Sequence, residues 1–167
     1  MKFVILAAGK GTRLGMSAPK PLTKLKTGET ILERQVNFLS KYVDKKDISI
    51  VVGYKKELIM NAFPDCTFIF NPNYDKTNTA KSLLCALTNN SDSDIIWING
   101  DVVFDSKVLI PLLNSKKSSM LVNTESVSDE EVKYNLNNDG SIKQVSKDIN
   151  DGIGEAVGIN KISKNYI

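Results

Sequence analysis

Three basic side chains lie in and beside a glycine-rich stretch near the start of the chain. Lys10 and Arg13 belong to the segment Leu6–Gly15, and Lys20 follows within the segment Pro19–Leu22. Backbone N–H groups approach phosphate oxygens closely where glycine leaves out a side chain, and nearby cations offset the phosphate charge. The stretch therefore predicts a site that holds a polyphosphate. The plainer alternatives are turn glycines and solvated surface charges.

The glycine spacing separates this loop from two common nucleotide-binding loops. Gly9, Gly11 and Gly15 do not follow the G-x-G-x-x-G order of dinucleotide-binding folds. A P-loop ends in Gly-Lys-Ser or Gly-Lys-Thr, and this stretch lacks that ending. The loop therefore indicates a different class of phosphate-binding site.

A carboxylate stands after a second apolar run. Asp101 follows Asn99-Gly100 at the end of the residues Ile95–Ile98. In an open α/β sheet this position lies at the carboxyl edge, where ligands bind. The position of Asp101 predicts a ligand for an Mg²⁺ ion that bridges phosphate groups. The alternative is an aspartate that belongs to a turn or caps a helix. Asp105 competes for the metal role, but we assign it to capping the next helix.

The composition excludes several classes of chemistry. The 167 residues include no histidine, which rules out histidine acid–base catalysis, histidine metal sites and a Ser-His-Asp triad. Cys66 and Cys85 lack metal-ligand spacing, so we expect reduced packing residues. The net charge of +3 is mild and both signs are interspersed, so no nucleic acid partner is expected. The chain shows neither a signal peptide nor a membrane-length apolar run, so we expect no membrane partner and a cytoplasmic location.

The elements that must position these residues alternate over the first two-thirds of the chain. We expect strands at 3–8, 48–52, 67–70 and 95–98, and helices after Thr30 and at 55–63, 79–87 and 106–114. Thr30 and Glu33 have capping-box spacing. Pro111 conflicts with the last helix because proline removes a helical hydrogen bond, so a kink or a shorter helix is expected. The alternation predicts an α/β fold, a three-layer α/β/α sandwich with a mostly parallel, Rossmann-like sheet.

The pattern changes in the C-terminal third. Strands are expected at 120–122, 132–136, 141–146 and 156–162. Asn137-Asn138-Asp139-Gly140, between the second and the third of these strands, is a strong hairpin turn signal. We therefore expect a small antiparallel β-hairpin excursion beside the main sheet, within one domain of residues 1–167.

Four stretches together resemble the signature of nucleotidyltransferases that join a nucleoside triphosphate to a phosphorylated small molecule. They are LAAGKGTRLG with PKPL, residues 78–83 (NTAKSL), residues 98–102 (INGDV), and the hairpin leading to Lys147 with residues 154–159 (GEAVGI). The chain is similar to sugar-phosphate nucleotidylyltransferases, and most of all to the CTP-using enzymes for phosphocholine and inositol phosphate. The resemblance extends from Met1 to about Ser163.

This resemblance implies roles for individual residues. Nucleotide binding is implied for Leu6, Ala7, Ala8, Gly9, Lys10, Gly11, Thr12, Arg13, Lys20, Asn78, Ser82 and Gly100. Arg13, Lys20 and Asp101 would be catalytic, the two cations on the phosphates and the carboxylate on Mg²⁺. Ser82 would contact the base, and Lys147 and Glu155 would bind the acceptor.

Several of these residues have plainer alternatives. Asn78 also fits a helix cap, Lys147 an ordinary hairpin lysine and Glu155 an exposed strand residue. Trp97, inside an apolar strand, is expected in the core. Tyr54 and Tyr74 lie in loops at strand ends and are candidates for lining an acceptor pocket.

The functional prediction is a Mg²⁺-dependent cytidylyltransferase. The resemblance implies transfer of CMP from CTP to a small phosphorylated acceptor, with release of pyrophosphate, in the synthesis of cell-surface polysaccharide precursors. A phosphocholine-like compound, a polyol phosphate, an inositol phosphate and a phosphonate all remain open as acceptors. The alternatives are a sugar-1-phosphate uridylyl- or thymidylyltransferase and a nucleotide-binding domain without turnover.

The resemblance also implies a segment beyond Ile167. Members of the family usually continue past the GExxGI-type strand with helices and a second acidic metal ligand. We therefore expect the family's C-terminal segment to be missing from residues 1–167. A homodimer contact could belong to the same segment.

Overall fold

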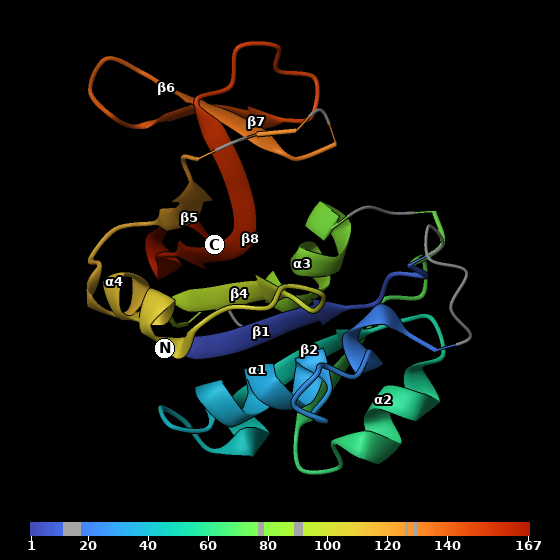
Figure 1. Ribbon diagram of the computed structural model, residues 1–167. Coiled ribbons are helices and arrows are strands. Elements are labelled where there is room, and N and C mark those ends of the chain that lie inside the picture. Colours follow the sequence, from blue (N-terminus) through green and yellow to red (C-terminus); the bar gives the residue numbers. More distant parts are fainter. Residues whose placement is uncertain (12–17, 77–78, 89–91, 126, 129) are drawn as a thin grey trace.

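The computed structural model describes residues 1–11, 18–76, 79–88, 92–125, 127–128 and 130–167 (Figure 1). The helices are α1 (Ile31–Leu39), α2 (Lys56–Ala62), α3 (Thr79–Leu87) and α4 (Leu109–Asn114). The strands are β1 (Lys2–Ala7), β2 (Ile48–Val52), β3 (Thr67–Phe70), β4 (Ile95–Asn99), β5 (Ser119–Asn123), β6 (Lys133–Leu136), β7 (Ile142–Ser146) and β8 (Gly154–Ile162). The strands predicted from the sequence are confirmed, most of them with ends shifted by one or two residues.

The sheet is parallel where the sequence alternates strand and helix. Its order is β3-β2-β1-β4-β8-β6-β7, with β5 beside β8. β1 lies between β2 and β4 and runs parallel to both, and β3 runs parallel to β2. Parallel strands are covered on both faces, which explains the continuous apolar runs in their sequences. The predicted α/β fold with a mostly parallel, Rossmann-like sheet is confirmed.

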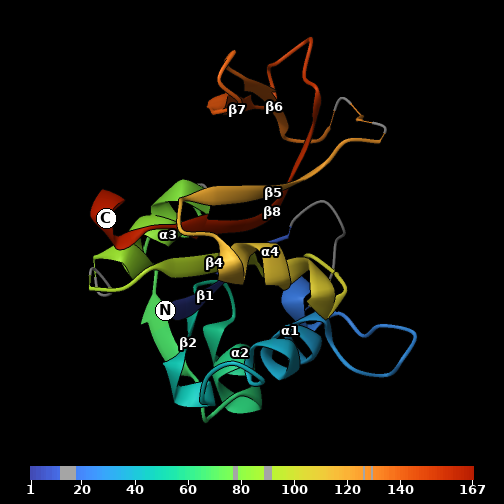
Figure 2. The same cartoon turned by 90° about the vertical axis from the view of Figure 1, so that its left-hand side faces the viewer.

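Helices cover the two faces of this sheet and create two apolar cores (Figure 2). Alternate residues of β1 and Ala8 after it enter the two cores, with Phe3, Ile5 and Ala7 on one side and Val4, Leu6 and Ala8 on the other. The first core also holds buried apolar residues of α1, α2 and α4, and the second holds Ala86 of α3. The predicted capping box begins α1: Thr30 Oγ1 accepts from Glu33 N, and Glu33 accepts from Thr30 N.

The conflict at Pro111 is resolved by a break in the helix. A 3-10 helix, η4 (Ser106–Val108), precedes α4, so Pro111 lies in the first turn of a short α-helix. Proline is tolerated there because the N–H groups of a first turn have no partner inside the helix. Asp105 caps η4 by accepting from Lys107 N at 2.9 Å, as the sequence predicted.

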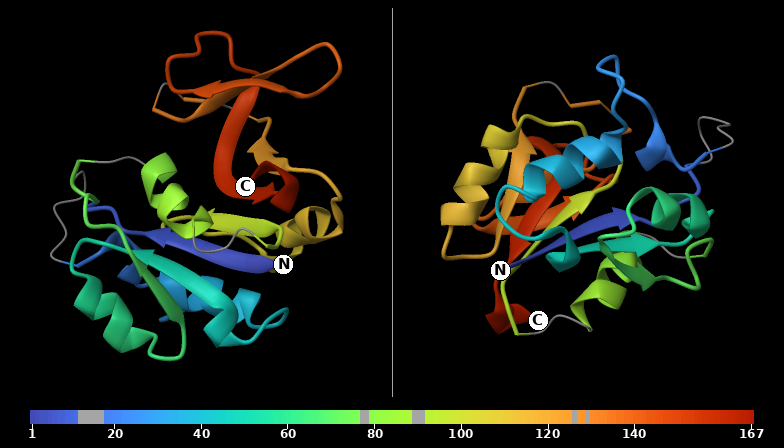
Figure 3. Two further views of the ribbon diagram at one scale, coloured as in Figure 1. Left: turned by 180° about the vertical axis from the view of Figure 1, so that it is seen from behind. Right: turned by 90° about the horizontal axis from the view of Figure 1, so that it is seen from below.

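The C-terminal third is antiparallel and is joined to the main sheet. β6 and β7 form the predicted hairpin around Asn137–Gly140, and Gly140 has φ +79°. The hairpin stands away from the end of the molecule that holds α1 and α2 (Figures 1 and 3). β8 pairs with β6 near its start and with β4 near its end. β8 therefore belongs both to the sheet that holds β4 and to the hairpin of β6 and β7. The sequence did not predict this shared position.

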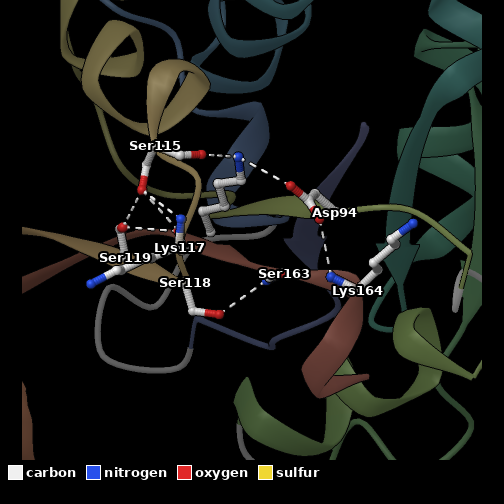
Figure 4. Close-up of polar contacts among 8 residues, drawn as sticks. Asp94, Ser115, Lys117, Ser118, Ser119, Ser163 and Lys164 are labelled. Atoms are coloured by element: carbon white, nitrogen blue, oxygen red, sulfur yellow. Dashed lines mark hydrogen bonds and ion pairs between the residues drawn. The ribbon is translucent and has the colours of Figure 1, made fainter.

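Polar contacts hold the end of β8 beside the start of β4 (Figure 4). Lys161 Nζ donates to Ser115 O at 2.6 Å and lies 3.2 Å from Asp94 Oδ2, and its side chain is only 2% exposed. Asp94 also accepts from the backbone N of Lys164, and Ser118 Oγ accepts from the backbone N of Ser163. These contacts fasten β8 at the amino end of β4.

Three smaller expectations concern the two cysteines, Trp97 and membrane-spanning segments. Neither Cys66 nor Cys85 forms a disulfide with another described residue. Cys66 is buried in the first core, where burial raises the pKa of its thiol. Trp97 packs against the second core, as predicted. Among the residues that the structure describes, no helix combines the length and the apolarity needed to cross a membrane.

Candidate active site

A cleft of about 350 Å³ lies at the carboxyl ends of β1 and β4. Its lining comes from the end of β1 and the loop after it, the 3-10 helix η2 (Lys20–Leu22), the start of α3 and the end of β4. The lining residues are Leu6, Ala7, Ala8, Gly9, Gly11, Lys20, Pro21, Tyr74, Thr79, Ser82, Asn99 and Asp101. The fold thus brings most of the predicted nucleotide-binding residues to one cavity.

Glycine is needed at one position of the loop after β1. Gly11 has φ +58°, and a Cβ at this position would lie 3.3 Å from Lys20 Cβ. A side chain would therefore be strained and would crowd the lysine. At Gly9 a Cβ would meet no described atom within 4 Å, so the space around it is open.

Lys20 and Asp101 form an ion pair at the cleft. Lys20 Nζ donates to Asp101 Oδ2 at 2.7 Å, and the two side chains are 40% and 41% exposed. The residues are 81 positions apart and come from η2 and from the turn after β4. The pair places a cation that can bind phosphate and a carboxylate that can bind a metal within contact of each other.

A buried glutamine supports the turn that carries Asp101. Gln35, on α1, is 1% exposed, and its Nε2 donates to Asn99 O at 3.0 Å and to Val102 O at 2.7 Å. These two carbonyls flank Gly100 and Asp101 in the chain. The sequence interpretation missed Gln35, although a polar residue beside Leu32 and Val36 on the apolar face of a helix is a signal that could have found it.

Gly100 packs the same turn against β1. Its N–H donates to Leu6 O at 2.9 Å, and a Cβ would lie 2.9 Å from that oxygen and 3.1 Å from Pro21 Cγ. A side chain at this position would collide with β1 and η2, so glycine allows the turn after β4 to pack closely against both. Direct nucleotide contact at Gly100 stays a prediction.

Ser82 has a buried partner that the sequence interpretation also missed. Asn71, in the loop after β3, donates from Nδ2 to Ser82 Oγ at 3.0 Å. Both residues are buried, and Ser82 lines the cleft from α3. Asn71 and Ser82 are 11 residues apart and lie in different segments, so their contact could not be predicted from the sequence.

Tyr74 forms a wall of the cleft, and Gly53 makes room for it. A Cβ at Gly53 would lie 2.5 Å from Tyr74 Cβ and 2.8 Å from Ala8 O. Lys10 Nζ lies over the Tyr74 ring, 5.8 Å from its centroid, and the centroid of the Tyr54 ring lies 6.5 Å from that of Tyr74. The predicted phosphate-binding lysine thus lies beside the cleft, against an aromatic side chain.

The oxygen atoms at the cleft fit the coordination of a magnesium ion that would enter together with a triphosphate. Asp101 supplies one carboxylate, and Asn99 Oδ1 is a buried oxygen without a partner among the described residues. No group of three or more His, Cys, Asp or Glu in the described ranges could hold a metal by itself. Mg²⁺ commonly uses one or two carboxylates together with substrate phosphates, so Asp101 with a bound triphosphate would satisfy it.

Other predicted site residues lie outside this cavity or outside the described residues. Lys147 is exposed just after β7, and Glu155 is on β8, paired in register with Asn123 and Lys133. Neither lines the cleft. Thr12, Arg13 and Asn78 lie outside the described residues, so the structure says nothing of their roles.

The orientation of β8 nevertheless brings its first half to the same edge of the sheet as the cleft. Its last pair with β4 toward the cleft is Ile98 with Ile159, and the two strands are antiparallel. The residues before Ile159, including Glu155, therefore extend past the carboxyl end of β4.

Comparison with known proteins identifies relatives of this chain. A family model for the MobA-like NTP transferase domain matches residues 3–128. The bifunctional protein GlmU of Methanococcus aeolicus is 40% identical over 109 residues, covering 63% of this chain and 26% of that protein. The CMP-5'-(3-aminopropyl)phosphonate synthase of Streptomyces rubellomurinus is 32% identical over 128 residues, covering 71% and 20%. The chain thus spans about a quarter of the length of the curated relatives it matches.

Solved structures share the fold at lower identity. The inositol-1-phosphate CTP transferase from T. maritima superposes with a TM-score of 0.75 at 17% identity, over 98% of this chain and 71% of that chain. HddC from Yersinia pseudotuberculosis, complexed with GMP-PN, gives a TM-score of 0.75 at 22% identity, over 99% and 78%. These likenesses establish the nucleotidyltransferase-type fold.

Proposed function

The chain belongs to the MobA-like NTP transferase domain family, and on this premise we propose that it transfers CMP from CTP to a small phosphorylated acceptor, releasing pyrophosphate. The observation that carries the proposal is the meeting of Lys20 and Asp101 at a cleft bordered by the glycine loop after β1. A phosphate-binding cation and a metal-binding carboxylate in contact are the groups that nucleotidyl transfer requires.

The reaction needs little covalent help from the protein. An oxygen of the acceptor phosphate attacks the α-phosphorus of CTP, a P–O bond forms, and the bond to pyrophosphate breaks in line with it. Lys20 would leave Asp101 and hold the phosphates, where it offsets the charge on departing pyrophosphate. Mg²⁺ held by Asp101 would supply further charge neutralisation of the phosphate oxygens. This chemistry suits a chain without histidine.

Two relatives favour CTP as the donor. One is named for a CMP-linked phosphonate product and another for CTP transfer to inositol 1-phosphate. A structure of similar fold holds GMP-PN, so the fold by itself does not select the base. Ser82 in the cleft, as the residue proposed to contact the base, is the feature of this chain that supports cytosine.

The acceptor would lie between the cleft and the C-terminal strands. Glu155 on the extended half of β8 would face an acceptor with a cationic head, and Lys147 after the hairpin would meet its phosphate. Both roles come from the family resemblance. The position of β8 at the carboxyl edge of the sheet supports them.

The proposal is tested by pyrophosphate release from CTP, UTP, dTTP, GTP and ATP with Mg²⁺ and a panel of phosphorylated acceptors. We expect turnover to be highest with CTP. Asp101→Asn should lower kcat about 100-fold or more, because the metal loses its charged ligand. Asp105→Asn is the matched control, since this aspartate caps η4 and does not line the cleft.

Three results would contradict parts of this proposal. Normal turnover in Asp101→Asn would remove this residue from the metal role. Release mainly from UTP or dTTP would favour a sugar-1-phosphate uridylyl- or thymidylyltransferase. Nucleotide binding without turnover of any triphosphate, in the full-length protein, would favour a non-catalytic nucleotide-binding domain.

A further inference from the structure

The amide of Asn71 has a fixed orientation in the interior. Asn71 is 2% exposed, and its Oδ1 accepts from the backbone N of Asn73 at 3.0 Å. Because a backbone N–H only donates, the atom facing it must be the amide oxygen. The other amide atom, Nδ2, is therefore a hydrogen-bond donor.

This donor is aimed at the hydroxyl of Ser82. Asn71 Nδ2 donates to Ser82 Oγ at 3.0 Å, and the contact is buried. The bond occupies one lone pair of Oγ and leaves the hydroxyl hydrogen unused by Asn71. Ser82 lines the cleft, and no acceptor for that hydrogen is found among the residues that the structure describes, so the hydroxyl can offer it to a ligand there.

We propose that Asn71 is a positioning residue that makes Ser82 a hydrogen-bond donor toward the cleft, and that this polarity selects cytosine over uracil and thymine. The inference rests on the proposed function, because it takes Ser82 to meet the edge of the base. Cytosine presents N3 as an acceptor, whereas uracil and thymine present N3–H as a donor at the same place. Two donors facing each other leave both hydrogens unpaired, which disfavours the wrong base.

The sharpest test reverses the polarity without changing the shape. In Asn71→Asp, measured at a pH high enough to ionise the buried carboxyl, one carboxylate oxygen still accepts from Asn73 N–H. The other oxygen can then only accept, so it takes the hydrogen of Ser82. The hydroxyl then presents lone pairs to the cleft. We expect the ratio of CTP to UTP affinity, measured by calorimetry with Mg²⁺ and without acceptor, to fall at least tenfold.

Two further variants separate polarity from general damage. In a Ser82→Ala background, Asn71→Asp should leave the CTP-to-UTP ratio unchanged, because the hydroxyl that transmits the effect is gone. If the buried carboxylate of Asn71→Asp prevents folding, Asn71→Ala serves instead. It frees the hydroxyl to rotate, so the ratio should fall at least threefold. Thermal unfolding of each variant shows whether it is folded.

The outcomes distinguish this inference from the proposed function. A wild-type chain that binds CTP no better than UTP overturns the choice of CTP and this inference with it. A wild-type chain that prefers CTP, with the same preference in the folded Asn71 variants, overturns the inference alone. A falling ratio that persists in the Ser82→Ala background also overturns it, because Asn71 would then act through another group.

Discussion

Lys20 and Asp101 form the ion pair on which the proposed function rests, and it is a weak contact. Both side chains are about 40% exposed, and exposed ion pairs contribute about 0–1 kcal/mol. Such a pair is easily exchanged for stronger partners, a phosphate for the lysine and a metal for the carboxylate. The low energy of the pair is therefore compatible with a site that rearranges when a charged ligand enters.

Gln35 acts on the same site from inside the molecule. Its amide donates to both carbonyls that flank the Asp101 turn, and it does so from a buried position on α1. Replacement by Met keeps the length of the side chain but removes both donors. A buried carbonyl that loses its partner costs about 1–3 kcal/mol. The turn should then hold Asp101 less firmly.

We therefore expect Gln35→Met to lower the free energy of unfolding by about 1–2 kcal/mol and to raise the Mg²⁺ concentration for half-maximal turnover. The KM for CTP at saturating Mg²⁺ should change less than kcat. Denaturant unfolding and Mg²⁺ titrations of pyrophosphate release measure these effects. An equal loss of stability with an unchanged Mg²⁺ dependence would show that Gln35 is only structural.

β8 connects the parallel sheet to the hairpin, and polar contacts hold its C-terminal end beside the start of β4. Lys161 is almost fully buried and its Nζ is shared between Ser115 O and Asp94, which stands just before β4. A buried charge that loses its partner is costly. The contacts around Asp94 thus hold the strand whose other half reaches the cleft edge.

We expect Asp94→Asn to destabilise the fold by about 2 kcal/mol, less than a fully buried pair because the carboxylate is 29% exposed. The pKa of Asp94 is held below its usual value of 3.8, mainly by the hydrogen bond from the backbone N–H of Lys164 and also by Lys161. A carboxyl with a lowered folded-state pKa contributes stability above its unfolded pKa and loses it as the pH falls through the folded pKa. The wild type should lose this contribution below about pH 4, and Asp94→Asn should lack that part of the acid dependence.

Urea unfolding at pH 7 and at a series of pH values down to 2.5 checks this expectation. Asp65→Asn is the control, because the pair that Asp65 forms with Lys45 at 4.0 Å is exposed. It should change stability by less than about 0.5 kcal/mol. If both variants have the same small effect, the contacts of Asp94 do not secure β8.

In the molecule as a whole, ligand binding and stability should be coupled. The cleft is built from β1, η2, α3 and β4, which are far apart in the chain, so a ligand there would bind the folded state and not the unfolded chain. Such a ligand raises stability by about 2.7 kcal/mol at a concentration 100 times its Kd. Under the proposed function, the triphosphate would also bring negative charge close to the Asp101 carboxylate, and Mg²⁺ would offset the repulsion between the two.

CTP with Mg²⁺ should therefore raise the melting temperature of the chain, and removal of the metal with EDTA should abolish most of that rise. Differential scanning fluorimetry over a CTP series measures both. Lys24→Met is a control for nonspecific charge effects, because Lys24 lies outside the cleft lining. A melting temperature that rises equally with and without metal would contradict a metal-assisted site at Asp101.

Much of the fold followed from local pattern. The apolar runs, the capping box at Thr30 and the turn at Asn137–Gly140 are short-range signals, and each element they predicted is present. The helix predicted at 106–114 begins as 3-10 because Pro111 is accepted only in a first α-helical turn. The membership of β8 in the main sheet could not be predicted, because pairing with β4 is a contact between residues distant in sequence.

The sequence by itself determined the elements, the glycine loop and the identity of the charged residues, because propensities, turns and motifs depend on neighbours in the chain. Only the tertiary structure decided which of these residues meet. It joined Lys20 to Asp101, placed Gln35 behind the aspartate and Asn71 behind Ser82, and left Lys147 and Glu155 outside the cleft lining. The physical reason is that contacts between distant segments follow from sheet order and helix packing, and these are properties of the whole fold.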